Sequence, residues 1–229
     1  MRTLILFLLT ATLATAAEPF EVVRKSPFWR DQHGTLRIED AQVCYTPKGK
    51  EAEVRCWSYG DIQHLDWVSP TRLDLLSYED VAWKLGRDRL YRFELVEGEL
   101  NEAQFAQMRT KLGKAVTDRV PAAAPAGEEG LPAKQLKTFG GSEGSLFLSP
   151  EQIVYRTDAK EQARAWRMDG EVESVWSSDP YRLEVHVYEG SEGAFRQPKV
   201  YKFELKKPLD RELYRRLKQR LYAIERGRY

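Results

Sequence analysis

The sequence contains few of the residues that usually carry chemistry. Its 229 residues include two cysteines and three histidines. The histidines (His33, His64 and His186) do not stand at metal-ligand spacing, and the sequence has no Gly-x-Ser-x-Gly elbow or glycine-rich phosphate loop. Basic and acidic residues number 36 and 35, so the totals give no strong positive field for nucleic acid or anionic membranes. We therefore expect no enzyme, no metal, no other cofactor and no nucleic-acid partner.

Long hydrophobic runs are also absent after the N-terminus. The run Leu4–Leu13 follows Arg2 and precedes the small residues Ala14–Ala17, the pattern of a secretory signal peptide over residues 1–17. A membrane anchor fits less well, because the run is shorter than the ~20 apolar residues that span a bilayer. We expect an exported protein, periplasmic or secreted, with no transmembrane segment after cleavage.

One stretch of the sequence occurs twice. Residues 70–95 and 180–205 align at a constant offset of 110, and nine of the 26 positions are identical. The motifs Pro-x-Arg-Leu, Tyr-Glu and Tyr-x-Phe-Glu-Leu recur in both copies. This pattern predicts an internal duplication with two similar domains.

Alternating apolar residues predict several short strands in each copy, and the end of each copy predicts a helix. Asn101 and Asp210 are expected N-caps, and the apolar helix faces are Phe105, Met108 and Leu112 in one copy and Tyr214, Leu217 and Leu221 in the other. Residues 120–132 are rich in Pro, Ala and Gly, which predicts a linker. The expected plan is an N-terminal arm that adds a strand or lies across the first domain (18–33), domain 1 (34–115), linker (116–141) and domain 2 (142–229).

The order of strands, the acidic-aliphatic motifs Asp61-Ile62 and Glu171-Val172, the Tyr-x-Phe-x-Leu strand and the closing helix resemble the PH-like superfold, in particular bacterial PH and GRAM-type domains. The resemblance implies an α+β fold of two tandem domains, each a bent antiparallel sheet or partly open barrel closed by one C-terminal helix. It also implies binding rather than catalysis. The connections at Glu39-Asp40 and Ser149–Glu151 lack the basic cluster of the lipid-binding members, so we expect no phosphoinositide-type binding.

The two cysteines, Cys44 and Cys56, flank the loop of the first predicted hairpin symmetrically, so they are expected opposite each other on one sheet face. In an oxidising compartment this arrangement favours a disulfide. The alternative is two buried free thiols.

Other repeated residues are interpreted as structural. Trp57 and Trp166 are expected in the cores, and the recurring residues Glu79, Glu189, Arg72 and Arg182 are expected in Arg–Glu pairs between neighbouring strands.

Three tryptophans that the two copies do not share, Trp67, Trp83 and Trp176, are candidate binding residues, because tryptophan is enriched in binding hot spots. The alternative is that they pack against the arm or the other domain. The expected function is an exported, non-catalytic binding protein that recognises a protein or peptide partner in the cell envelope, at a sheet edge or beside a closing helix. A carrier of a small apolar or lipid ligand is the alternative, and an envelope hydrolase is a third hypothesis.

Overall fold

The structure is a computed structural model that describes residues 18–26, 30–81, 84, 86–120, 129–189 and 198–227. The N-terminal half contains β1 (Phe20–Lys25), β2 (Gln32–Ile38), β3 (Gln42–Pro47), the 3₁₀ turn η1 (Glu51–Glu53), β4 (Arg55–Ser58), β5 (Ile62–Ser69), β6 (Arg72–Asp80), β7 (Asp88–Leu95) and α1 (Glu102–Leu112). The rest contains β8 (Thr117–Asp118), β9 (Leu131–Leu136), β10 (Gly141–Leu148), β11 (Gln152–Arg156), β12 (Arg164–Arg167), β13 (Val172–Trp176), β14 (Arg182–Val187), β15 (Lys199–Leu205) and α2 (Arg211–Arg226). The predicted signal peptide lies outside the described residues.

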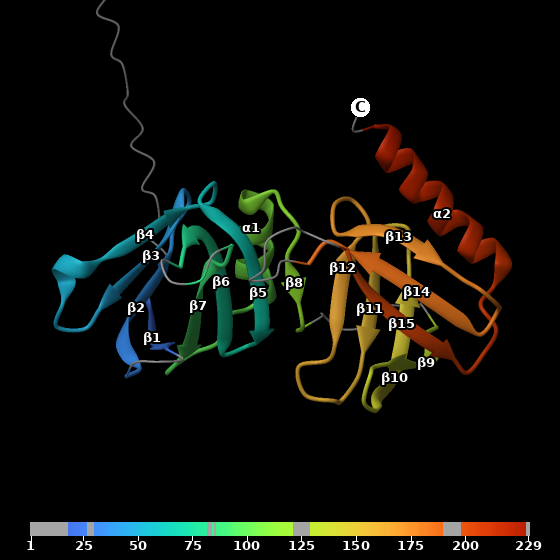
Figure 1. Ribbon diagram of the computed structural model, residues 1–229, viewed down its shortest axis with the longest axis horizontal. Coiled ribbons are helices and arrows are strands. Elements are labelled where there is room, and N and C mark those ends of the chain that lie inside the picture. The colour runs from blue at the N-terminus through green and yellow to red at the C-terminus, as the bar shows by residue number, and fades with distance from the viewer. Residues whose placement is uncertain are drawn as a thin grey trace, which may run out of the picture.

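The described strands form one open sheet of 15 strands (Figure 1). Their order is β13-β14-β15-β9-β10-β11-β12-β8-β5-β6-β7-β1-β2-β3-β4. Among these strands, β13 and β4 are the two edges, each paired on one side. A mainly β chain with two α-helices agrees with the predicted α+β class.

Alternation of apolar and polar residues explains the strands, because successive side chains point to opposite faces. In β14, Leu183, Val185 and Val187 are buried, whereas the residues between them are more exposed. Each half gathers such residues into its own hydrophobic cluster. The two clusters match the two expected cores.

The N-terminal arm contributes a strand to the sheet. β1 pairs antiparallel with both β2 and β7, and Val22 is fully buried. Of the two alternatives for residues 18–33, strand addition is therefore the one observed.

The expected linker range contains two strands, so the prediction for residues 116–141 was wrong in part. β9 lies between β10 and β15, and Ala133 is buried in the second core. The prediction failed because it rested on composition. A strand held by backbone pairing needs few large apolar side chains, so a Pro-, Ala- and Gly-rich stretch can still form one. Residues 121–128 lie outside the described part of the chain.

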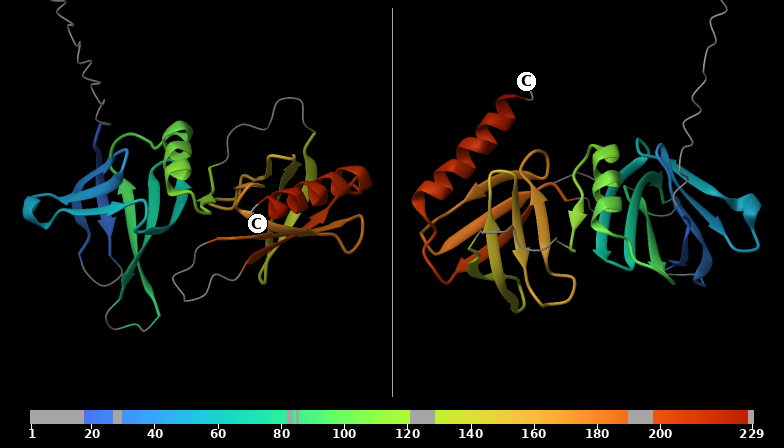
Figure 2. Two further views of the ribbon diagram at one scale, coloured as in Figure 1. Left: turned by 90° about the horizontal axis from the view of Figure 1, so that it is seen from above. Right: turned by 180° about the vertical axis from the view of Figure 1, so that it is seen from behind.

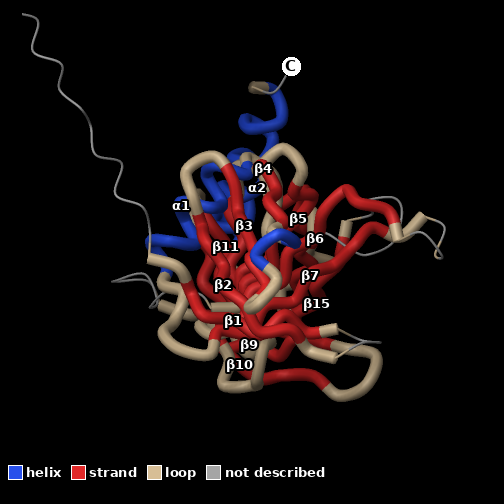
Figure 3. The backbone as a smooth tube through the Cα atoms, turned by 90° about the vertical axis from the view of Figure 1, so that its left-hand side faces the viewer, coloured by secondary structure: helices blue, strands red, loops and turns tan. Residues whose placement is uncertain are grey.

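Both helices begin at the expected caps. Asn101 and Gln104 form a reciprocal capping box at α1, and the Asp210 side chain accepts from the Leu213 backbone N–H at 2.7 Å at α2. α1 and α2 lie toward the same side of the strands (Figure 3). Among the described residues, no helix is long and apolar enough to cross a membrane.

The two halves are joined through β8. It pairs parallel with β5 and antiparallel with β12, so it lies between the halves (Figure 1). Next to it, Arg109 of α1 contacts Asp118 at 3.5 Å and reaches Glu171 of the C-terminal half at 3.1 Å. All three side chains are largely buried, so this junction is a packed contact.

Candidate binding groove

Trp67 lies in the core of the N-terminal half. Its side chain is 2% exposed, and its ring packs on Phe105 of α1 with centroids 4.9 Å apart. The prediction of a surface binding residue fails here, because inward-facing residues of β5 are buried under α1. Its role is packing.

The other two candidate tryptophans differ in outcome. Trp83 lies outside the described residues, so its role stays a prediction. Trp176, at the end of β13, is 59% exposed, and the ammonium of Lys218 lies 5.4 Å from its ring centroid. Of the three, Trp176 is therefore the one that is exposed on the described surface.

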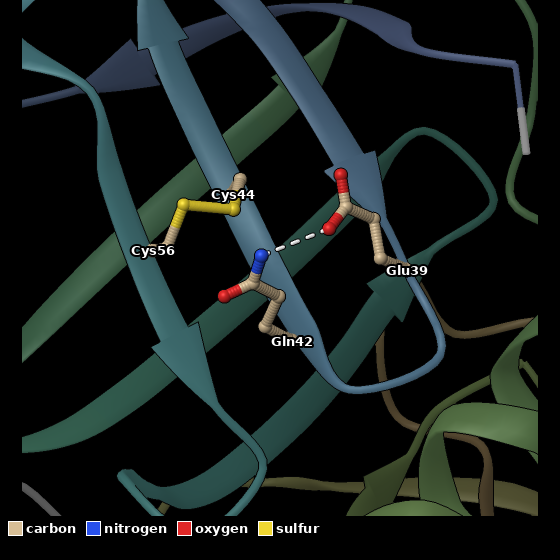
Figure 4. Close-up of a disulfide and its surroundings, with 4 residues drawn as sticks. All are labelled: Glu39, Gln42, Cys44 and Cys56. Carbon is tan, nitrogen blue, oxygen red and sulfur yellow. Dashed lines mark hydrogen bonds between the residues drawn. A yellow bond between two sulfur atoms is a disulfide. The ribbon is translucent and has the colours of Figure 1, made fainter. Parts of the chain in front are cut away.

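The expected disulfide is present (Figure 4). Cys44 and Cys56 are directly paired residues of β3 and β4, with Cα atoms 4.1 Å apart. Beside the bond, the side chain of Gln42 donates to that of Glu39 at 2.9 Å. The bond closes the hairpin at the β4 edge of the sheet.

Each half contains a matching polar network around one glutamate. Glu79 accepts hydrogen bonds from the Trp57 indole and the Tyr91 hydroxyl, both at 2.8 Å. Glu189 accepts them from the Trp166 indole at 3.2 Å and from the Tyr201 hydroxyl at 2.8 Å. The cations that complete the networks are Arg55 and Arg89 beside Glu79, and Arg164 and Lys199 beside Glu189.

The Glu189 network is the more deeply buried of the two. Burial alone would raise the pKa of Glu189, but Lys199 and Arg164 outweigh it and hold that pKa below its ordinary value. The Glu189 carboxylate is therefore ionised, and its neighbours supply it with hydrogen bonds and ion pairs.

Arg72 and Arg182 do not form the expected ion pairs with Glu79 and Glu189. They pair with Asp74 and Asp179, which lie two and three residues away along the chain. Arg72 and Asp74 share one face of β6, where they meet directly.

A groove of about 340 Å³ lies between β13 and α2. These two elements lie at the end of the molecule away from the N-terminal half (Figure 1). We call it the β13–α2 groove. Its lining combines apolar, aromatic and charged side chains, among them Val172, Trp176, Lys218, Leu221, Tyr222 and Glu225. Because β13 is an edge of the described sheet, the groove places a strand with no second strand partner among the described residues beside a partly apolar helix face. One of its carbonyls, that of Val175, accepts from the Tyr214 hydroxyl of α2 at 3.5 Å.

α2 fills this space poorly. Of its apolar face, Leu217 is fully buried, whereas Tyr214, Leu221 and Ile224 are only partly buried and Tyr222 is 62% exposed. The helix also extends past the strands toward its C-terminal end (Figure 2). By contrast, all three residues of the predicted α1 face are buried.

The difference follows from where each helix ends. α1 stops at Gly113, whose left-handed backbone (φ 61°) turns the chain back along β5. The next residues fill the space between β5 and α1, with Val116 fully buried. At the matching position α2 has Tyr222 and continues to Arg226, so no such segment follows within the described chain.

The sequence pattern predicted one of these groove residues, Trp176, whereas Lys218 and Tyr222 were not predicted. The signal was present in the aligned helix ends, where glycine in one copy stands against tyrosine in the other.

No protein-family model matches the chain, and no curated protein matches it. Among solved structures, that of the Spt16D Pob3N heterodimer is similar at 10% identity and a TM-score of 0.28, covering 82% of this chain and 96% of that chain. A likeness at this TM-score carries no conclusion about fold or function, which have to come from the geometry of this chain.

Proposed function

We propose that this protein is an exported, non-catalytic binding protein that recognises an extended segment of a partner protein in the β13–α2 groove. One observation carries the proposal. The space between strand and helix is occupied by a strand of the chain itself in the N-terminal half, and it is an open groove in the C-terminal half. A partner segment that pairs with the β13 edge would complete the same packing.

The architecture that we propose around this groove is two tandem PH-like domains from an internal duplication. The matching glutamate networks support it, because Trp57, Glu79 and Tyr91 correspond in sequence and in contacts to Trp166, Glu189 and Tyr201. The disulfide supports export, since such bonds persist in oxidising compartments.

The test is a selection of random displayed peptides on the full chain. We expect selected peptides to bind the unchanged protein and to lose about tenfold or more in affinity on Trp176→Ala, because exposed tryptophan anchors dominate such interfaces. Phe139→Ala is the matched control, because Phe139 is 91% exposed and does not line the groove. Selected peptides that bind both variants equally, or a selection that yields none, would contradict the proposal.

The second candidate is a carrier of a small apolar or lipid ligand. The aliphatic part of the groove lining favours it, whereas Lys218 and Glu225 in the same groove favour a peptide. Native mass spectrometry separates the two, because a carrier retains a co-purifying small mass and a peptide-binding protein does not.

A further inference from the structure

The chain carries its own example of what such a groove binds. We propose that the β13–α2 groove takes an extended segment that runs parallel to β13 and has a basic residue four positions before an acidic one, with an aliphatic residue between them. This inference rests on the proposed function and specifies the partner.

The example is the segment 114–119, which follows α1 and runs parallel to β5. Its backbone is fixed at its far end, where the Arg119 N–H donates to the Trp67 carbonyl at 3.0 Å. Along its length the two ring nitrogens of His64 contact the Ala115 carbonyl and the Thr117 hydroxyl, each at 2.9 Å. Val116 between them is fully buried in the core.

Charged side chains fix the two ends of the segment. Asp118 lies 3.5 Å from Arg109 on α1. Four residues earlier, the Lys114 ammonium donates to the Ile62 carbonyl at 2.7 Å and lies 4.9 Å from the ring centroid of Tyr78. The segment therefore presents a cation, an aliphatic residue and an anion in that order, followed by a second cation, Arg119, which pairs with Asp66 of β5.

The β13–α2 groove presents counterparts of these contacts. With an offset of 110 in the strands and 109 in the helices, Ile62, His64, Tyr78 and Arg109 correspond to Val172, Ser174, Tyr188 and Lys218. All four of these counterparts line the groove. Ser174 offers a hydroxyl where His64 offers ring nitrogens, and Lys218 offers a cation where Arg109 does.

The charges of the groove are arranged to match such a segment. Lys218 lies over Trp176, at the end of β13. Within the described chain no ion pair joins Lys218 to a carboxylate, and its contacts are with the rings of Trp176 and Tyr214. Glu225 lines the groove seven residues further along α2, about 10 Å from Lys218 by helix geometry. Glu173 lines it near the start of β13.

A segment parallel to β13 would therefore place its acidic residue at Lys218 and its basic residue toward the two glutamates. The aliphatic residue would lie between Val172 and Leu221, in the position that Val116 has in the N-terminal half. The reverse order of charges would oppose both ends of the groove.

The test uses two synthetic peptides of identical composition added to the full chain. The first is Lys-Ala-Val-Thr-Asp-Arg-Val, the sequence of residues 114–120, and the second exchanges its Lys and Asp. We expect the first to bind at least about tenfold more tightly, the scale of a desolvated charge contact. Amide chemical shifts should locate it on residues 172–176. In Lys218→Glu, whose changed side chain is exposed, we expect the preference to fall or reverse.

The possible results separate this inference from the proposed function. Equal binding of both peptides at β13, or binding of display-selected peptides without an acidic residue, would overturn the charge pattern and leave the groove as a peptide site. Shifts confined to β5 would overturn the inference too, since the peptide would then be replacing β8. If neither these peptides nor any selected peptide affects β13, both proposals fail.

Discussion

At the scale of single residues, the disulfide is the contact that most clearly stabilises one part of the fold, the hairpin of β3 and β4. Cys44 and Cys56 join the β4 edge to the rest of the sheet across a short loop. A bond that closes a loop of this length contributes about 2–3 kcal/mol, mainly by restricting the unfolded chain. We expect the variant with both cysteines changed to serine to lose this amount in urea unfolding. A reductant should weaken the original protein but not the variant, and equal responses would contradict the assignment.

Glu171 should make stability depend on pH. Burial raises its pKa to about 7, against a carboxyl pKa of about 4.3 in an unfolded chain. Between these values the folded protein keeps a proton that the unfolded chain has released, so the free energy of unfolding falls as pH rises through this window. The charge of Arg109 lowers the pKa of Glu171, whereas the charge of Asp118 raises it further. Burial also raises the pKa of Asp118 itself.

The variant Glu171→Gln tests this assignment, since the amide oxygen can still accept from the Arg167 N–H, which donates to Glu171 at 2.8 Å. We expect the free energy of unfolding of the original protein, measured in urea, to fall by about 3 kcal/mol more than that of the variant between pH 4.5 and 7.5. Parallel curves for the two proteins would show that Glu171 titrates normally.

Which residues could be predicted depends on how local their role is. Cys44, Cys56, Trp57 and Trp166 could be placed because strand pairing and burial follow from spacing. Trp67 could not, because its burial depends on a helix about 40 residues later in the chain. Lys218 could not, because a lysine on a helix gives no sign of the tryptophan beneath it.

At the scale of elements, Gly113 decides how the two helices differ. Its φ of 61° is a left-handed conformation that L side chains rarely adopt, although a Cβ there would meet no atom within 4 Å. Gly113→Ala should therefore cost about 1–2 kcal/mol from backbone strain alone. The matched control is Gly227→Ala at the end of α2, where φ is −77°, and we expect a change within about 0.5 kcal/mol. Thermal unfolding of both variants is the measurement, and equal effects would contradict this explanation.

Elements with strong periodicity were predictable, and those fixed by pairing were not. The strands of the repeat and both helix caps could be placed from alternation and capping residues. β8 and β9 could not. β8 has two residues and exists because β5 and β12 lie on either side of it, and β9 begins Leu-Pro-Ala, which has the composition of a linker.

At the scale of the whole molecule, Arg109 of α1 links the halves through two carboxylates, Asp118 of β8 and Glu171 of the C-terminal half. Asp118 and Glu171 both lose their cation in Arg109→Ala. We expect the free energy of unfolding to fall by about 3 kcal/mol at pH 8, where Glu171 is ionised, because a buried charge is left unpaired. The loss should shrink at pH 5, where Glu171 holds a proton. Urea unfolding at both pH values is the test, and an equal loss would mean that Arg109 acts only by packing.

We propose that the β13–α2 groove holds a strand of a partner, as the space between β5 and α1 holds β8. The most direct test is hydrogen–deuterium exchange of the full chain with and without the peptide of residues 114–120. We predict slower exchange along residues 172–176 and the second half of α2, and no change along residues 55–58 at the other sheet edge. Unchanged exchange at 172–176 under saturating peptide, or protection of both edges alike, would contradict the claim.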